Sequence, residues 1–434
     1  MLALSLIRNE PNRVRAGLAA KGEPTDALDA VLKHDEQRRA ILGELEDLRR
    51  QVNDISRQIG PVPDQEARQT LIAQSKEASA GIGPLEERLA TAETALNELL
   101  LAIPNLPHES VPAGKDETDN VEVRRVGDIP KFDFAPLGHV EIAEALGIFD
   151  TGRAAKLSGS GFWLHCGLGA KLQRVLIGWM LDLHTTRHGY TEVYPPALIR
   201  SDAMLGTGQL PKFANDSYHI EGDNLWLAPT AEVPVTNIHR EEILSADQLP
   251  INYAAYTPCF RREAGAAGTE TRGLLRVHQF DKVELVKFVE PETSYAEQLK
   301  LLANAETVLQ ELELPYRVIE LCAGDLSGAN TKCFDIELWA PGTPGESDDE
   351  LGRWIEISSV SNFEDYQARR AGIRYRSEKG ARPRFVHTLN GSGVALPRLI
   401  VALLENNQQP DGSVLIPAAV QDALGTDRIA APTN

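Results

Sequence analysis

Two apolar stripes with heptad spacing, separated by a turn rich in Pro and Gly, constrain the fold of the first hundred residues. The first stripe comprises Ile41 or Leu42, then Leu45, Leu48, Val52, Ile55 and Ile59. The second comprises Ala78, Ile82, Leu85, Leu89, Ala92, Leu96, Leu99 and Ile103. Steps that alternate three and four residues are typical of the buried seam of a coiled coil. Because Gly60, Pro61 and Pro63 stop the first helix, the pattern predicts an antiparallel helical hairpin with a first helix about 50 Å long.

Small residues and a proline interrupt the second stripe without changing its phase. Gly81, Gly83 and Pro84 lie inside it. A proline in a helix removes a backbone hydrogen bond and clashes with the preceding turn. We therefore expect a kink or a new helix start at this point of the arm.

Five arginines form two adjacent basic stripes on the first helix. They are Arg38, Arg39, Arg49, Arg50 and Arg57. Spacings of eleven and seven residues return almost to the same face of a helix that turns about 100° per residue. One interpretation is a ridge that follows a phosphate backbone. The solvated outer face of a coiled coil stays open as an alternative, because acidic residues outnumber basic ones over residues 1–104.

The composition limits the classes of partner. The chain has 434 residues, 25% of them charged, and a formal net charge of −19. Such an acidic chain has no general affinity for membranes or nucleic acid, so a nucleic-acid partner requires a local basic patch. The start lacks a signal-peptide pattern, and no apolar run approaches the roughly 18 residues of a membrane helix. Widely spaced cysteines fit a reducing compartment, so we expect a cytoplasmic protein.

A Pro-rich linker separates the arm from the rest of the chain. We place the arm at residues 1–104, the linker at 105–130 and the main domain at 131–434. Short apolar or alternating runs follow one another in the main domain at 225–228, 251–260, 274–288, 316–321, 334–339 and 354–359. Consecutive strands with little crossover indicate an α+β fold with a mainly antiparallel sheet. Neither GxxxxGK[ST] nor GxGxxG lies between a strand and a helix, which excludes the usual parallel-sheet phosphate loops.

Residues 258–284 are expected to form two strands joined by a glycine-rich loop, and they carry an unusually large number of charged residues for such a hairpin. The titratable residues of interest are Arg261, Arg262, Glu263, Arg272, Arg276, His278 and Glu284. Buried charge is costly unless it is paired, so one interpretation is a floor that grips a charged ligand. A solvated amphipathic hairpin is the alternative when this stretch is considered alone.

A second candidate segment precedes the apolar helix at 399–404. Small residues at 391–393 allow the backbone to approach a ligand closely, and Pro397 suits a first helical turn. Arg398 adds positive charge beside the positive end of the helix dipole, which favours an anion. A plain turn into a core helix is the alternative.

Together these segments resemble the class II aminoacyl-tRNA synthetases. Residues 260–263 with Arg276, Phe280 and Glu284 resemble motif 2, residues 391–398 resemble motif 3, and the helix ending before Gly189 resembles motif 1, the dimer element. Five further stretches are similar to the seryl-tRNA synthetase family: 206–213, 229–234, 278–284, 356–359 and 387–392. That family also carries a helical arm in front, so the resemblance covers essentially the whole chain.

The resemblance implies a class II sheet flanked by helices. It implies ATP-dependent activation of L-serine to seryl-adenylate and transfer of the seryl group to tRNA(Ser), with tRNA(Sec) left open as a second acceptor. It further implies Mg²⁺ as cofactor, a homodimer, and an arm whose basic stripes grip the long variable arm of tRNA. Attack on the α-phosphate needs in-line geometry and cations more than acid–base groups, which agrees with an arginine-rich floor.

The resemblance also assigns roles to single positions. Arg261 matches the arginine that joins the serine carboxylate to the α-phosphate, and Arg398 matches the one at the γ-phosphate. The remaining ATP-binding positions are Arg262, Glu263, Val277, Glu356, Ile357, Ser358 and Ser359, of which Glu356 and Ser359 match the Mg²⁺ positions. The serine-binding positions are Thr230 and Glu232 at the α-ammonium, Ala231 between them, and Glu284 and Ser392 at the hydroxyl.

Two departures from the family pattern and three alternatives accompany this assignment. Pro397 stands where the family often has glycine, and residues 341–352, with four acidic residues, are expected to form a longer surface loop. A paralogue that loads a carrier protein predicts loss of the arm, and a non-catalytic coiled-coil protein predicts loss of the motif arginines or of Glu284. All of these are present. A paralogue specialised for antibiotic resistance or biosynthesis retains every motif and stays open.

Overall fold

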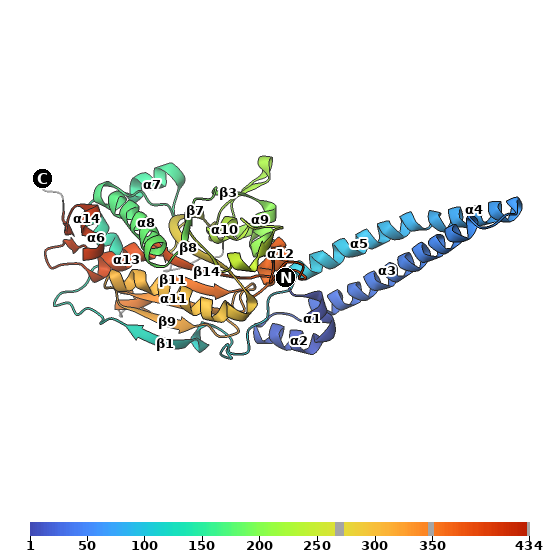
Figure 1. The fold of residues 1–434 in the computed structure, drawn as a ribbon. Helices are drawn as coiled ribbons and strands as arrows, with labels where there is room; N and C mark the ends of the chain where they lie inside the picture. The colour runs from blue at the N-terminus through green and yellow to red at the C-terminus, as the bar shows by residue number, and fades with distance from the viewer. Residues whose placement is uncertain (265–272, 346–350, 432–434) are drawn as a thin grey trace. The chain divides into compact units, whose positions relative to one another are not determined.

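The helical arm is one of two compact units in the chain. The computed structural model describes residues 1–264, 273–345 and 351–431, which divide into Met1–Pro104 and Asn105–Asn434. In the first unit, α3 (Asp26–Ile59) packs against α4 (Gln65–Ala80) and α5 (Ile82–Ala102), as the ribbon in Figure 1 shows. The 34 residues of α3 correspond to about 51 Å of helix. The predicted antiparallel hairpin is confirmed.

The interruption in the second stripe is a new helix start. Helix α4 ends at Ala80 and α5 begins at Ile82. Pro84 lies in the first turn of α5, where its missing N–H costs no helical hydrogen bond. A Cβ at Gly81 would lie 3.0 Å from Leu48 Cδ2 of α3, so glycine allows the two helices to approach closely at the junction.

Two short helices close the base of the arm. Helices α1 (Leu4–Asn9) and α2 (Pro11–Ala20) pack on α3 and bury Ile7, Val14 and Leu18. Arg8 donates through Nε and Nη2 to the two carboxylate oxygens of Asp35, at 2.8 and 2.9 Å. Because the Asp35 side chain is almost fully buried, this bidentate pair compensates the cost of burying its charge.

The second unit is built on an eight-stranded sheet. Its order is β1-β9-β10-β11-β14-β8-β7-β2, and every neighbouring pair is antiparallel except β2 with β7. The strands are β1 (Val121–Val126), β9 (Tyr316–Glu320), β10 (Lys332–Pro344), β11 (Leu351–Asn362), β14 (His387–Ala395), β8 (Gln279–Val289), β7 (Ile251–Phe260) and β2 (Thr191–Val193). The prediction of a mainly antiparallel sheet is confirmed.

Smaller elements surround this sheet. The shorter helices of this unit are α6 (His139–Ala145), α7 (Thr151–Ser158), α9 (Ser201–Thr207), α10 (Glu232–Thr236), α12 (Tyr366–Ala371) and α14 (Ala418–Leu424). The remaining strands are β3 (Leu198–Arg200), β4 (His219–Ile220), β5 (Leu225–Leu227), β6 (Ile243–Ser245), β12 (Arg374–Arg376), β13 (Arg384–Phe385), β15 (Val414–Leu415) and β16 (Arg428–Ile429). Among the helices that the structure describes, none is both long and apolar enough to span a membrane.

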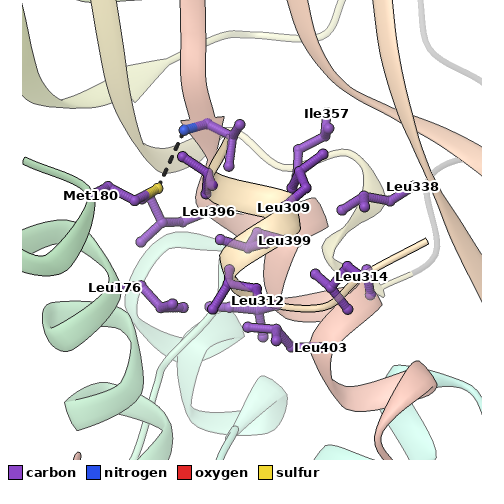
Figure 2. Close-up of a cluster of buried hydrophobic side chains, with 14 of the residues drawn as sticks. Leu176, Met180, Leu309, Leu312, Leu314, Leu338, Ile357, Leu396, Leu399 and Leu403 are labelled. Carbon is purple, nitrogen blue, oxygen red and sulfur yellow. Dashed lines mark hydrogen bonds between the residues drawn. The ribbon is translucent and has the colours of Figure 1, made fainter. Parts of the chain in front are cut away.

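Three helices bury one face of the sheet and form the main core with it. They are α8 (Gly167–Arg187), α11 (Ser294–Glu311) and α13 (Leu396–Asn406). Figure 2 shows Met180 of α8, Leu309 of α11 and Leu399 of α13 converging with Leu338 of β10. The backbone N–H of Val394 donates to Met180 Sδ at 3.3 Å, which ties the end of β14 to α8.

Residues that alternate along the central strands turn to the other face. In β8, Val283 and Leu285 belong to the main core, whereas Val286 and Phe288 belong to a second core with residues of α10 and α12. The two-residue period of a strand produces this division. Consequently the strip of β8 that continues from the second core, Lys282 and Glu284, is also turned away from the main core.

The prediction of a surface loop at 341–352 is wrong for the first residues of this range. Strand β10 continues to Pro344, and Gly342 and Thr343 are buried. The buried side chain of Glu405 holds both residues, because it accepts from Gly342 N at 2.9 Å and from Thr343 Oγ1 at 2.8 Å. Sequence polarity could not reveal a partner so distant in the chain. Residues 346–350 lie outside the described residues.

Candidate active site

The hairpin of β7 and β8 forms the floor of the site. The strands pair in register from Ile251 opposite Phe288 to Phe260 opposite Gln279. Lys282 and Glu284 are nearly buried on the face away from the main core. Two charged residues at strand positions this buried require compensating partners.

Glu284 is held by a hydroxyl and an ammonium group. Thr230 Oγ1 donates to Glu284 Oε2 at 2.8 Å, and Lys282 forms an ion pair with the same oxygen. Ser392 of β14 lies directly opposite Glu284 in the β14–β8 pair. The structure therefore brings together three of the predicted serine-binding residues, Thr230, Glu284 and Ser392. The first two are 54 residues apart in the sequence.

Glu232 is the second carboxylate of this region. The backbone N–H of Glu232 donates to Thr230 Oγ1 at 3.2 Å, and Gln367 Nε2 donates to Glu232 Oε1 at 2.7 Å. Desolvation, and then the negative charge of Glu284, raise the pKa of Glu232 to about 7. Ala231 lies between these residues with its side chain in the second core, so only its backbone is available to a ligand.

Arg261 connects the floor with the segment that carries Thr230. Its Nε donates to the carbonyl of Pro229 at 3.4 Å, and its guanidinium lies over the ring of Phe280 at 5.2 Å from the centroid. A cation over an aromatic face keeps a fixed orientation at low entropic cost. The guanidinium is thus held next to the two carboxylate-bearing elements.

Arg262 and Glu263 take different directions from Arg261. Arg262 Nη1 donates to the carbonyl of Asn215 at 3.2 Å, in the 3₁₀ turn Ala214–Asp216. Glu263 has a φ of +48° and forms an ion pair with Arg276 Nε at 2.8 Å. Arg272, singled out in the sequence, lies outside the described residues.

Glu356, Ser359 and Arg398 form a second polar group, on β11 and α13. Ser359 Oγ donates to Glu356 Oε1 at 3.1 Å, and Arg398 Nη1 lies 3.4 Å from Glu356 Oε2. Arg398 Nη1 also donates to the carbonyl of Glu356 at 2.6 Å. Desolvation alone would raise the pKa of Glu356, but the positive charge of Arg398 and the hydroxyl of Ser359 outweigh it and lower that pKa.

Two acidic residues of β10 adjoin this group. Asp335 pairs with Ser359 across the strands, and Glu337 pairs with Glu356. Burial, followed by the charge of Glu356, raises the pKa of Asp335 well above its ordinary value, and burial also raises that of Glu337. Among the described residues, no group of three or more His, Cys, Asp or Glu side chains has metal-binding geometry. Glu356 and Ser359, whose side-chain oxygens lie 3.1 Å apart, offer two neighbouring oxygen ligands of the kind that Mg²⁺ prefers.

Three predicted ATP-binding positions have side chains that are engaged within the protein. Ile357 and Val277 belong to the main core, and Ser358 Oγ donates to the carbonyl of Ser392 at 2.7 Å. A register shift opposite Ile336 and Glu337 interrupts the two-residue period of β11, so Glu356 and Ser359 lie on one face while Ile357 turns into the main core. Any contact from Ile357 or Val277 to a nucleotide's polar atoms would use the backbone.

The five arm arginines all have carboxylate partners, but of two kinds. Arg38 and Arg49 of α3 form ion pairs with Glu93 and Glu86 of α5, at 3.1 and 2.6 Å. Three pairs stay within α3, namely Arg39 with Asp35, Arg50 with Asp47 and Arg57 with Asp54. The side chains of Arg50 and Arg57 are the most exposed of the five, at 69% and 82%. These two are therefore the most accessible to a phosphate backbone.

Sequence reasoning did not single out Lys282, Gln367 or Asn390. Lys282 precedes Glu284 by two residues, a spacing that places both on one face of a strand, so the signal was available. Gln367 of α12 reaches Glu232 across 135 residues of sequence, which no local pattern reveals. Asn390 shares a face of β14 with Ser392, and its buried Nδ2 has no hydrogen-bond acceptor within the described part of the chain.

Two family models match the chain, one for each unit. Residues 216–407 match the tRNA synthetase class II core domain (G, H, P, S and T). Residues 1–107 match the seryl-tRNA synthetase N-terminal domain.

Individual relatives match over the full length. The serine–tRNA ligase of Thermomicrobium roseum is 52% identical over 98% of this chain and 94% of the relative. Seryl-tRNA synthetase from Pyrococcus horikoshii, solved in complex with ATP, has a TM-score of 0.91 and 38% identity, with each chain fully covered. The cytoplasmic serine–tRNA ligase of Naegleria fowleri, solved in complex with AMP, has a TM-score of 0.88 and 30% identity, covering 100% of this chain and 99% of the relative. This chain belongs to the seryl-tRNA synthetase family.

Proposed function

We propose that this chain activates L-serine with ATP to form seryl-adenylate and transfers the seryl group to the terminal adenosine of tRNA(Ser). The observation that carries the proposal is Glu284, a buried carboxylate held by Thr230 and Lys282 directly opposite Ser392. A cytoplasmic location goes with this reaction.

Glu284 and Ser392 recognise the serine hydroxyl. Glu284 has only acceptor oxygens when ionised, so it accepts a hydrogen bond from the serine hydroxyl, and Ser392 supplies a second polar group from the neighbouring strand. Thr230 and Lys282 both contact Oε2 of Glu284, so alanine would leave Oε1 and the Ser392 hydroxyl without the serine hydroxyl as a partner, which costs more than the loss of one favourable contact. Such a site rejects the analogue that lacks the hydroxyl by about 10⁴-fold.

Glu232 and Thr230 take the α-ammonium of serine, and Arg261 takes its carboxylate. The ionised form of Glu232 supplies the negative charge, and Gln367 fixes one of its oxygens. Arg261 adjoins the same segment through Pro229. Its planar guanidinium can hold the serine carboxylate and the α-phosphate together, which aligns the nucleophile for attack.

Arg262, Glu263 and Arg398 orient ATP, with support from relatives solved with ATP and with AMP. Arg398 is held at Nη1 by Glu356 and provides fixed positive charge at the end of α13, where the γ-phosphate binds. Glu356 and Ser359 are the ligands we propose for Mg²⁺, which would neutralise phosphate charge when bound. These chain residues act by position and charge, not by proton transfer.

The arm binds tRNA through its exposed arginines, and the active unit is a homodimer. Arg50 and Arg57 are the strongest candidates for phosphate contacts because their side chains are the most exposed. For the dimer, β2 is an edge strand of the eight-stranded sheet, and Tyr194 directly after it is 79% exposed. A large exposed apolar residue beside a free strand edge favours pairing with a second copy.

ATP–pyrophosphate exchange across the amino acids tests this proposal. We expect serine to support exchange, alanine to be rejected, and tRNA(Ser) to accept the seryl group in a charging assay. Exchange with another amino acid but not with serine would refute the assignment. Charging of tRNA(Sec) in the same assay decides whether it is a second acceptor.

A further inference from the structure

A fully buried carboxylate lies on α13 outside the substrate-contacting groups. Glu405 is 0% exposed and accepts four hydrogen bonds. The donors are His139 N at 3.0 Å, His139 Nδ1 at 2.8 Å, Thr343 Oγ1 at 2.8 Å and Gly342 N at 2.9 Å. This number of donors compensates the cost of burying a carboxylate. Through these hydrogen bonds, Glu405 joins α13 to the start of α6 and to the end of β10.

The other nitrogen of His139 reaches the segment next to the ATP site. The backbone N–H of Leu274 donates to His139 Nε2 at 3.1 Å. Since an amide N–H can only donate, Nε2 carries no proton and Nδ1–H donates to Glu405. The ring is thus a neutral imidazole with both nitrogens used. Leu274 belongs to the 3₁₀ turn Gly273–Leu275, which directly precedes the strand that carries Lys282 and Glu284.

The same turn also holds Arg398. The carbonyl of Leu275 accepts from Arg398 Nε at 3.1 Å. Arg398 and Glu405 are seven residues apart on α13, which places them on the same face two turns apart. Helix α13 therefore holds the turn at two points, through Arg398 directly and through Glu405 by way of His139. These contacts close a ring that runs from Arg398 through the turn and His139 to Glu405.

The turn packs directly on the imidazole. A Cβ built at Gly273 would lie 2.0 Å from His139 Nε2, and φ at this glycine is +71°. Glycine is the residue that accepts both this conformation and this approach. The turn is consequently seated on the imidazole by contact as well as by the hydrogen bond to Leu274.

We propose that His139 and Glu405 are positioning residues for the ATP step. They seat the turn Gly273–Leu275 so that the Leu275 carbonyl fixes Arg398 Nε, which leaves the outer edge of the guanidinium directed to Glu356 and the nucleotide. The inference rests on the proposed function, because it acts through the arginine assigned to the γ-phosphate. Neither residue touches the serine-binding groups, so the effect is selective for ATP.

A pair of substitutions separates the two hydrogen bonds of the ring. H139N keeps an amide at the place of Nδ1 for Glu405 but does not reach Leu274. H139Q places an amide oxygen near the position of Nε2 and can accept from the Leu274 N–H. We expect H139N to raise the KM for ATP about tenfold and to leave the KM for serine within about twofold. H139Q should stay within about threefold of the wild type for both, because it keeps the contact to Leu274 and the backbone N–H of residue 139 still donates to Glu405.

A matched control removes the effect of general destabilisation. V420A truncates a fully buried residue of α14 away from the ring, and we expect it to lower Tm without raising the KM for ATP. If H139N does not fold, T343V removes one donor to Glu405 with His139 in place, and we expect an ATP-selective rise of about threefold.

The measurements are ATP–pyrophosphate exchange at varied ATP and serine, and calorimetric ATP binding in wild-type and Arg398→Ala backgrounds. H139N should weaken ATP binding in the first background and add nothing in the second, because it acts through Arg398. Equal behaviour of H139N and H139Q, parallel changes in both KM values, or additivity with Arg398→Ala would overturn the proposal. Failure of the wild type to exchange with serine would instead refute the proposed function.

Discussion

The arm and the floor of the catalytic unit use the same charged residue types at opposite degrees of burial. On the arm, Arg49 and Glu86 form an ion pair in which both side chains are about half exposed. On the floor, Lys282 and Glu284 form one in which both are below a tenth exposed. An exposed pair contributes about 0–1 kcal/mol to stability, whereas removal of one partner of a buried pair costs about 3–5 kcal/mol.

This difference explains how each region can bind its ligand. Except for the buried Asp35 beside Arg39, the carboxylate partners of the arm arginines are at least half exposed. We therefore expect that a phosphate backbone can replace them at little cost, with an affinity that depends on the number of contacts and on salt. The buried groups of the floor are fixed before a ligand arrives, so we expect them to discriminate between ligands that differ by one hydroxyl. The arm is suited to affinity for a large anion and the floor to selectivity.

Removal of the arm tests the comparison most strongly. For a chain lacking residues 1–104, we expect tRNA charging to fall by roughly three orders of magnitude, because all the proposed contacts of the arm to phosphate would be lost at once. Serine-dependent ATP–pyrophosphate exchange should stay within about threefold, because the second unit holds its own core. Aminoacylation and exchange assays on the same preparation check this. Unimpaired charging would refute the role of the arm.

Neutralising one carboxylate in each region compares their energies directly. In E284Q, Lys282 is left nearly buried without its counter-ion, so we expect the free energy of unfolding to fall by about 3–5 kcal/mol and serine kcat/KM to fall about a hundredfold. In the matched variant E86Q, stability should change by less than about 0.5 kcal/mol. Urea denaturation and pyrophosphate exchange give both quantities. Similar stability losses in the two variants would contradict the comparison.

The pKa of Glu232 predicts a pH dependence for the floor that the arm lacks. Since its pKa is raised to about 7, the carboxylate that we propose for the serine ammonium is mostly neutral at pH 6, and we expect the KM for serine to be about tenfold higher at pH 6 than at pH 8. The raised pKa also means that its contribution to stability is lost as the pH rises from about 4.5 to 7 in the free protein. The variant E232Q should have a high KM for serine that does not change between pH 6 and pH 8, as measured by pyrophosphate exchange.

The smallest expected effect separates the arm arginines from one another. The double variant R50A/R57A removes the two most exposed cations, and we expect about fivefold weaker tRNA binding, with the salt slope reduced by roughly one for each arginine. The double variant R38A/R49A removes the pairs that join α3 to α5 and should have less effect on tRNA binding and more on Tm. Filter binding at several salt concentrations and thermal melts distinguish these outcomes. The reverse order would reassign the binding face.

Local periodicity predicted the arm better than the catalytic unit. Heptad spacing placed both long helices, and Gly81 with Pro84 marked the junction at which α5 begins. Helices α1 and α2 were not predicted, since their buried residues Ile7 and Val14 acquire partners only through the packing of these helices on α3. In the sheet, several expected strands were shorter than observed, and β14 was not among the predicted strands because its glycines carry no strand signal.

The sequence by itself determined the family, the helical hairpin, the antiparallel sheet and the positions that carry charge. These follow from local spacing and from motifs, which are written in neighbouring residues. Only the tertiary structure decided which charges meet. Glu284 gains Thr230 from 54 residues away, Glu232 gains Gln367 from 135, and His139 gains Glu405 from 266. The physical reason is that a buried charge is stable only beside its partner, and contacts between residues far apart in the sequence form only when the chain folds.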